Sequence, residues 1–252
     1  MGAALAIRAL SGLPEVRPGD DLAALLAATA GDDALRDGDV LCVAHKVVSK
    51  AEGRVVELAH VVPGERALAL AAAHGKDARQ LQVVLDESAA IVRERPGVII
   101  ARTRHGFVCA NAGVDASNAG GADRLVLLPA DPDASARALR AGLRARLGVA
   151  PAVVITDSFG RAWRRGQCET AIGVAGLTLV DDWAGRADSD GRDLRATAIA
   201  IADEAAAAAD LVRAKDSREP AVVVRGLAPH VTDDDGPGAV ALVRPVEEDL
   251  FA

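Results

Sequence analysis

Short apolar runs alternate with polar stretches along the whole chain, and each run has a length that suits a strand. The clearest is Val40-Leu-Cys-Val-Ala44, whose continuous apolar residues predict a strand buried on both faces. We predict further strands over residues 5–10, 98–103, 107–110, 125–128, 152–156 and 221–224, paired strands within 171–180, and a last short strand near Val240.

Helical segments lie between these strands, and the order strand, helix, strand over residues 125–156 is typical of a βαβ unit. Aspartates and glycines mark helix ends, because an Asp side chain can cap the first amides and glycine permits the turn that ends a helix. The predicted helices are one that begins after Asp20 or Asp21 and ends at Gly31, two over residues 65–74 and 78–94, one over 133–147 with a cap at Asp131 or Asp133, and a long alanine-rich one over 194–215.

This alternation predicts a mixed α/β (α+β) fold with mixed sheets. No repeat or low-complexity linker divides the 252 residues, so we expect a single domain over residues 1–252, built as two interleaved subdomains. Residues 228–252 are expected to form a less defined tail, because they contain an acidic run at 233–235 and a Gly-Pro-Gly segment at 236–238.

Composition and charge exclude several classes of function. With no tyrosine, three phenylalanines and two tryptophans, the aromatic platforms that stack on nucleic-acid bases are nearly absent. The formal net charge of −7 also argues against a general polyanion binder. Because no apolar stretch approaches the roughly 18 residues of a membrane span, we expect no membrane association. Three widely spaced cysteines, Cys42, Cys109 and Cys168, favour free thiols and a cytoplasmic location.

Two aspartates stand beyond apolar runs, which is where α/β folds tend to place ligands. Asp115 lies in the loop over residues 110–118, and Asp157 with Ser158 follows the predicted strand at 152–156. Carboxylate and hydroxyl oxygens suit Mg²⁺ or Mn²⁺. Taken singly, each loop is more readily explained as a structural turn than as a catalytic one, since Asp, Ser and Asn are favoured in turns.

Basic residues near these aspartates suggest phosphate binding. Arg161, Arg164 and Arg165 could grip phosphate or carboxylate oxygens, or form a solvated surface loop. Lys46 and Lys50 lie four residues apart, so on a helical turn both would point the same way, although a pair of exposed lysines is common. Neither a P-loop nor a dinucleotide-binding glycine motif is present.

Several segments in one order resemble the family of F420-0:γ-glutamyl ligases, also called coenzyme F420:L-glutamate ligases. The resemblance runs from about residue 10 to about residue 227. The segments that carry it are Gly12-Leu-Pro-Glu15, Lys46-Val-Val-Ser-Lys-Ala-Glu-Gly-Arg54, Leu85-Asp-Glu-Ser88, Ala110-Asn-Ala-Gly-Val-Asp-Ala-Ser-Asn118, Thr156-Asp-Ser-Phe-Gly-Arg161 with Trp163-Arg164, Ala171-Ile-Gly173 and Val224-Arg-Gly226.

The resemblance implies the family's fold and a GTP-dependent amide ligase of coenzyme F420 biosynthesis. Such an enzyme adds L-glutamate to the lactyl carboxylate of coenzyme F420-0 through an acyl phosphate, and then adds γ-linked glutamates. It implies two divalent cations, Mg²⁺ or Mn²⁺, with K⁺ as a further ion, and a homodimer. We also expect a standalone ligase, because the chain ends near Ala252 without the flavin-reductase-like extension that some relatives carry.

The same resemblance assigns site residues. Asp115 and Asp157 look like ligands of one divalent cation and Ser158 like a ligand of the second, while Lys215 stands close to that second site. No catalytic residue is assigned, but Arg161 and Arg164 are candidates. The positions similar to nucleotide-binding ones are Leu13, Pro14, Glu15, Val16, His45, Lys46, Lys50, Asn118 and Lys215.

Two other functions remain open from the residues alone. A metal-dependent phosphohydrolase could use the same aspartates on a phosphorylated metabolite. A non-catalytic protein that binds a nucleotide or a deazaflavin could use them without turnover.

Overall fold

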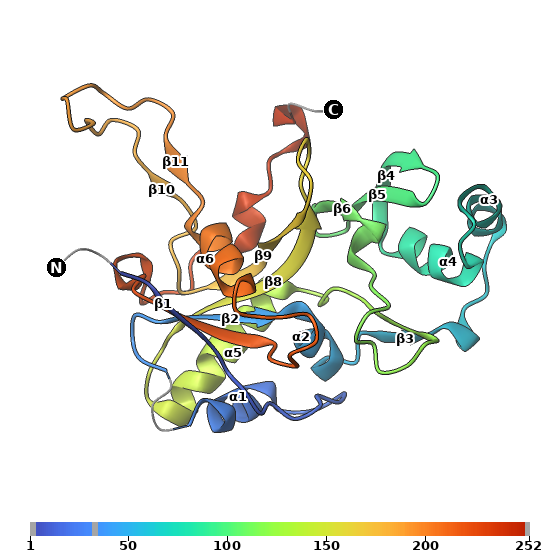
Figure 1. The fold of residues 1–252 in the computed structure, drawn as a ribbon, viewed down its shortest axis with the longest axis horizontal. Coiled ribbons are helices and arrows are strands. Elements are labelled where there is room, and N and C mark those ends of the chain that lie inside the picture. Colours follow the sequence, from blue (N-terminus) through green and yellow to red (C-terminus); the bar gives the residue numbers. More distant parts are fainter. Residues whose placement is uncertain (1–3, 32–34, 250–252) are drawn as a thin grey trace.

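The structure is a computed structural model that describes residues 4–31 and 35–249, and a five-stranded mixed sheet forms its centre (Figure 1). The strand order is β1-β12-β2-β8-β9, in which β2 and β8 run parallel and the other neighbours are antiparallel. These strands are β1 (Ala6–Ala9), β2 (Val40–Ala44), β8 (Ala152–Gly160), β9 (Gln167–Ala175) and β12 (Ala221–Arg225).

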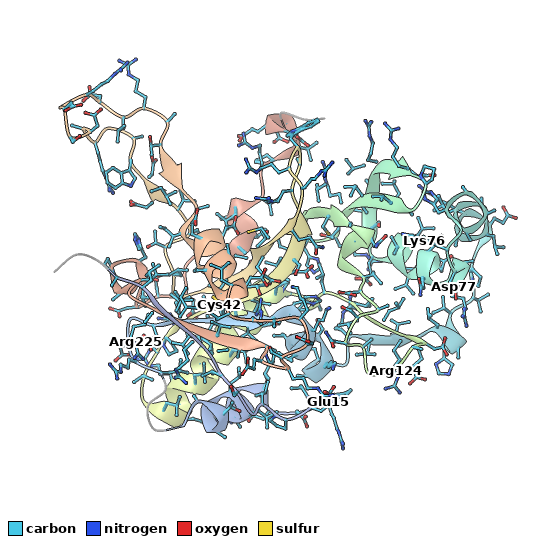
Figure 2. The ribbon with its side chains drawn as sticks, viewed as in Figure 1. Glu15, Cys42, Lys76, Asp77, Arg124 and Arg225 are labelled. Atoms are coloured by element: carbon cyan, nitrogen blue, oxygen red, sulfur yellow. The ribbon has the colours of Figure 1, made fainter. Side chains whose placement is uncertain are left out.

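Helices cover both faces of this sheet. Helices α1 (Leu22–Ala30) and α5 (Pro132–Leu147) pack on one face, against the side chains of Leu41 and Val43. Helix α6 (Ile201–Asp210) packs on the other face, against Val40 and Cys42, and Figure 2 labels Cys42 in this layer. Successive side chains of a strand point to opposite faces, so burial of both faces explains why β2 is apolar at every position.

A second group of elements lies between α2 (His45–Ala51) and α5 in the chain and to the right in Figure 1. It has its own apolar clusters, one centred on Leu81 and Ile99 and one on Leu58 and Leu125. Its elements are β3 (Val55–Glu57), α3 (Glu65–His74), α4 (Ala78–Asp86), β4 (Ser88–Arg95), β5 (Val98–Thr103), β6 (Val108–Ala110) and β7 (Arg124–Val126), with β4-β5-β6 forming one sheet and β3-β7 another.

The mixed α/β class with mixed sheets is confirmed, as are most predicted elements. Strands 40–44 and 98–103 and helix 65–74 have the predicted bounds. The side chain of Asp21 caps α1 by accepting the amide of Ala24 at 2.9 Å, and Gly31 follows the helix. Of the two candidates for α5, the cap is Asp131, which accepts the amide of Ala134 at 2.8 Å.

The single helix predicted over residues 78–94 is wrong. Helix α4 ends at Asp86, and the rest of that segment is strand β4. A two-residue turn at Pro96 and Gly97 joins β4 to β5, with Arg95 opposite Val98 and a positive φ of 82° at Gly97. Pairing with β5 therefore decides the conformation of a segment whose composition alone also suits a helix.

The predicted βαβ unit is also wrong, because β7 pairs antiparallel with β3, and the parallel neighbour of β8 is β2. Strand β8 is longer than predicted and contains Asp157 and Ser158, so the second aspartate lies within a strand. The paired strands predicted over 171–180 are replaced by the single strand β9 and an isolated bridge between Leu177 and Val231.

The predicted helix over 194–215 is shorter at both ends, because α6 covers only Ile201–Asp210. Residues 198–199 instead form β11, which pairs with β10 (Asp181–Asp182) at the base of an arm that projects from the body (Figure 1). The strand predicted near Val240 is a 3₁₀ helix, Ala239–Leu242, whose first two amides donate to the carboxylate of Asp133 at 2.6 and 3.1 Å.

Candidate functional site

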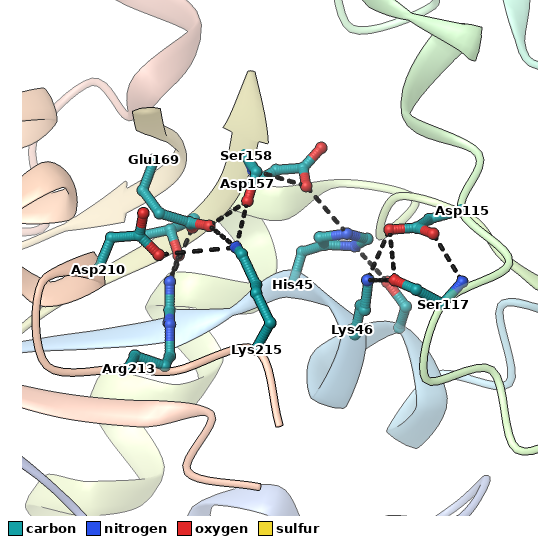
Figure 3. Close-up of polar contacts among 12 residues, drawn as sticks. His45, Lys46, Asp115, Ser117, Asp157, Ser158, Glu169, Asp210, Arg213 and Lys215 are labelled. Atoms are coloured by element: carbon teal, nitrogen blue, oxygen red, sulfur yellow. Dashed lines mark hydrogen bonds and ion pairs between the residues drawn. The ribbon is translucent and has the colours of Figure 1, made fainter. Parts of the chain in front are cut away.

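Two parallel strands place polar side chains at one edge of the central sheet. Ala44 is opposite Thr156, so the residues that follow them come out side by side. Because β2 passes directly into α2, the first residues of α2 are His45 and Lys46, and Asp157 follows Thr156 in β8. The carboxyl edge of parallel strands is where α/β sheets bind ligands. Figure 3 shows these side chains close together.

His45 is buried beneath this edge and contacts Asp157. Its side chain is 2% exposed, and the His45 Nε2 atom lies 3.3 Å from Asp157 Oδ1. On the other side of the ring, Nδ1 lies 3.4 Å from the hydroxyl of Ser49, one turn further along α2. The family resemblance assigns His45 to nucleotide binding. In the structure its ring is buried, and Nε2 faces the Asp157 carboxylate without a hydrogen-bond partner among the described residues.

Asp115 comes from the second group of elements and meets Lys46. Lys46 Nζ lies 2.6 Å from Asp115 Oδ2 and donates to Ser117 Oγ at 2.6 Å. The amide of Ser117 donates to Asp115 Oδ1 at 2.7 Å. The main chain of Asp115 is held as well, because its amide and carbonyl bond to Val126 at 3.0 and 2.8 Å. The carboxylate is therefore fixed in orientation.

These contacts keep Asp115 ionised. Burial alone would raise the pKa of Asp115, but the hydrogen bond from Lys46, the amide and hydroxyl of Ser117, and the positive charge of Lys46 together lower it below its usual value of 3.8. An ionised carboxylate that remains 41% exposed can take a further cation.

A buried thiol lies near Asp157 as well. Burial, together with the negative charge of Asp157, raises the pKa of Cys109 to about 12. The Cys109 thiol is therefore neutral at physiological pH and adds no charge beside the carboxylate. The Ser158 amide donates to Asp157 Oδ1 at 2.8 Å.

The hydroxyl of Ser158 belongs to a neighbouring cluster of charged side chains. It donates to Glu169 Oε1 at 2.5 Å and accepts a hydrogen bond from Lys215 Nζ at 2.7 Å. Lys215 Nζ also lies 3.3 Å from Glu169 Oε1 and 3.6 Å from Asp210 Oδ1. Arg213 completes the cluster, with its Nη2 atom 2.7 Å from Glu169 Oε2.

Glu169 is 5% exposed, yet its environment favours the charged form. Burial alone would raise the pKa of Glu169, but the charge of Arg213, the hydroxyls of Ser158 and Thr156, and the charge of Lys215 lower it below 4.5. Neither Glu169 nor Arg213 was identified from the sequence. The pairing of Glu169 with Ser158 across β8 and β9 is the signal that could have found it, once the hairpin register is known.

The predicted loop over residues 13–16 reaches α2 through one ion pair. Lys50 Nζ lies 2.5 Å from Glu15 Oε1, and Figure 2 labels Glu15 in the loop before α1, to the right of that helix. Val16 is buried in the core and Leu13 packs against it, while Pro14 and Glu15 are exposed. The loop is thus anchored by its apolar residues and presents its polar one to α2.

Three predicted residues make no contact with these clusters among those that the structure describes. Arg161 and Arg164 lie in the exposed turn between β8 and β9, where the Arg161 side chain donates to the carbonyl of Arg165 at 2.6 Å. Asn118 is exposed and has a positive φ of 55° in the loop that follows Asp115.

The two predicted cation sites differ in how well they suit a metal. Within the described part of the chain, no three His, Cys, Asp or Glu side chains form a ready-made metal site. Asp115 and Asp157 fit a divalent cation that takes its remaining ligands from phosphates and water, since Mg²⁺ commonly uses only one or two protein carboxylates. Ser158 does not fit, because its proton and one lone pair are used and the Lys215 ammonium already lies against its oxygen.

Comparison with known proteins now gives the class. Residues 12–226 match the model of the family described as F420-0:Gamma-glutamyl ligase. The chain is 46% identical over 239 residues to the coenzyme F420:L-glutamate ligase of Methanopyrus kandleri, covering 94% of this chain and 93% of that protein. The protein of the same name from Haloarcula marismortui is 45% identical, over 96% of this chain and 93% of that protein. The one from Methanothermobacter thermautotrophicus is 43% identical, over 96% of this chain and 96% of that protein.

These matches define the protein as a ligase. The chain belongs to the F420-0:γ-glutamyl ligase family, as the order of its segments predicted. No helix within residues 4–31 and 35–249 has both the length and the apolar character needed to cross a bilayer.

Proposed function

We propose that this protein is a GTP-dependent ligase that joins L-glutamate to the lactyl carboxylate of coenzyme F420-0 and then adds γ-linked glutamates. Family membership and the names of the relatives support the substrates. The observation that carries the proposal is the meeting of Asp115, Lys46, His45 and Asp157 at the carboxyl edge of β2 and β8. It combines carboxylates for a cation with an ammonium group for phosphate.

The chemistry requires activation, because a carboxylate is a poor electrophile. The lactyl carboxylate oxygen attacks the γ-phosphorus of GTP, and GDP leaves, which gives an acyl phosphate. The amine of glutamate then attacks the acyl carbon, loses a proton, and expels inorganic phosphate as the amide forms. A divalent cation would offset the negative charge on the transferring phosphoryl group.

The residues of the chain have distinct parts in this scheme. Asp115 and Asp157 would hold the cation, with His45 fixing the Asp157 carboxylate from the buried side. Lys46, bound to Asp115 at 2.6 Å, would move its ammonium toward a phosphate oxygen when the cation occupies the carboxylate. Lys50, four residues beyond Lys46 in α2, pairs with Glu15 of the loop over 13–16, and both would contact the nucleotide. The need for K⁺ and the choice between Mg²⁺ and Mn²⁺ remain predictions.

The test is a single incubation with GTP, Mg²⁺ or Mn²⁺, L-glutamate and coenzyme F420-0, followed by mass spectrometry of the deazaflavin. Successive additions of glutamate, with one GDP and one phosphate per addition, support the ligase. Phosphate release that does not need glutamate would instead identify a phosphohydrolase. Binding without turnover would identify a carrier.

Variants of the two aspartates test the site itself. We expect Asp115→Asn and Asp157→Asn to lower the rate of glutamate addition at least about 100-fold, because each removes a cation ligand whose charge stabilises the phosphoryl transfer by several kcal/mol. The matched control is Asp86→Asn, which alters an exposed carboxylate that contacts Gln82 on the far group of elements. Full activity of either site variant would refute the cation assignment.

The projecting arm supports a further proposal, that the protein forms a homodimer. The arm carries Trp183 and the partly exposed Ile199, and its strands β10 and β11 pair only with each other among the described residues. Isolated two-stranded hairpins are marginally stable, so a second copy packed on the arm would stabilise it. Light scattering after chromatography should give twice the mass of one chain. Replacing residues 184–196 with a short glycine-serine linker should reduce the measured mass to that of a single chain.

A further inference from the structure

The cluster at the ends of β8, β9 and α6 surrounds an ammonium group with oxygen atoms. Lys215 Nζ lies 2.7 Å from Ser158 Oγ, 3.3 Å from Glu169 Oε1 and 3.6 Å from Asp210 Oδ1 (Figure 3). A hydroxyl and two carboxylates are the ligands that a hard divalent cation prefers. Here a side chain of the protein supplies the positive charge at their shared position.

The charges of this cluster are already balanced. Glu169 and Asp210 carry two formal negative charges, and Arg213 and Lys215 carry two positive ones. Arg213 is 7% exposed and also donates to Thr156 Oγ1 at 2.9 Å, so its guanidinium is held in place. A divalent cation added beside Ser158 would therefore meet the buried charge of Arg213 and the exposed charge of Lys215 at short range, and would find no unpaired carboxylate in this cluster.

The neighbouring edge has the opposite balance. Asp115 and Asp157 carry two formal negative charges, Lys46 carries one positive charge, and His45 is counted as neutral. One negative charge remains for an added cation. The same protein thus offers one group of oxygens that attracts a divalent cation and a second group whose cation is built in.

We propose that the ammonium of Lys215 takes the place of a divalent cation at Ser158, Glu169 and Asp210, so that this protein binds one divalent cation at Asp115 and Asp157 and none at Ser158. The part concerning Asp115 and Asp157 rests on the proposed function. The part concerning Lys215 does not, because it follows from the contacts of the lysine alone. With 67% of its side chain exposed, Lys215 presents this charge to any phosphate bound over the edge.

Mn²⁺ binding to the apo protein tests the proposal without any turnover. Equilibrium dialysis or the loss of the free Mn²⁺ resonance counts the ions bound per chain. We expect about one Mn²⁺ per wild-type chain and about two per chain of Lys215→Gln, which removes the charge and adds an amide oxygen. Lys215→Glu serves as a second variant in case the first fails to fold. The matched control is Lys76→Gln, since the Lys76 ammonium donates to a neutral group, the side-chain oxygen of Asn111, at 3.4 Å.

Each outcome decides the question. A gain of one bound ion in either Lys215 variant, abolished by adding Ser158→Ala, supports the proposal. This holds even if the wild-type chain binds no ion, because that result would refute only the site at Asp115 and Asp157. Wild-type protein that binds two ions and loses one in Ser158→Ala would overturn it. Folded Lys215 variants with wild-type stoichiometry would overturn it as well.

Discussion

Arg213 holds a buried carboxylate in its charged form, and replacing this arginine should reveal the energetic cost. In Arg213→Met, Glu169 keeps its burial but loses the guanidinium at 2.7 Å. Breaking a buried ion pair from one side costs about 3–5 kcal/mol. Lys215 Nζ remains 3.3 Å from Glu169 Oε1, so we expect a loss near the lower limit, about 3 kcal/mol. For a chain of this size, that corresponds to a fall in Tm of about 6–12 °C.

The pH dependence of this loss distinguishes lost charge compensation from lost packing. In the wild type the folded pKa of Glu169 is below 4.5, so its stabilising contribution is present at neutral pH and is lost only as pH falls through that lowered pKa. In Arg213→Met, burial raises the folded pKa above the unfolded value. The folded state then binds a proton before the unfolded state does, and the deficit of the variant shrinks as pH falls from about 7 toward about 4.5.

The assay is urea unfolding followed by circular dichroism at about pH 7 and about pH 5, for wild type, Arg213→Met, Glu169→Gln and the double variant. We expect the double variant to recover at least about half of the loss, because removing both partners leaves no buried unpaired charge. A double variant as unstable as Arg213→Met, or an equal loss at both pH values, would refute the reasoning.

Two further predictions concern buried positions. Burial raises the pKa of both Cys42 and Cys109 to about 12, so the folded protein should react with iodoacetamide near neutral pH only at Cys168. Peptide mass mapping checks this, and modification of all three thiols at one rate would contradict it. Gly173→Ala should lower the free energy of unfolding by about 1–3 kcal/mol or prevent folding, because the added Cβ would lie 2.3 Å from the carbonyl oxygen of Pro132, the first residue of α5. The control Gly160→Ala, with open space around the added Cβ, should have the melting curve of the wild type.

The sequence predicted those elements whose cause is local. Val40–Ala44 has the predicted bounds because burial on both faces leaves a continuous apolar run. Segment 78–94 was mistaken for one helix, because the pairing of β4 with β5 depends on a partner that composition does not identify. The extension of β8 through Asp157 likewise depends on pairing with β9 across an exposed turn.

The site was predicted in part for the same reason. Asp115, Lys46 and Asp157 follow apolar runs, so their meeting could be anticipated, and the structure brings them to one sheet edge. Glu169 and Arg213 reach Ser158 through hairpin register and through the chain beyond α6, which leave no local motif. Arg161 and Arg164 have suitable chemistry, but they lie in the exposed turn.

The direct passage of β2 into α2 at His45 makes the length of the chain at this point critical for engineering. An α-helix turns about 100° and rises about 1.5 Å per residue. One residue inserted between Ala44 and His45 would therefore rotate Lys46 and His45 away from their separate carboxylates at once, without disturbing the sheet.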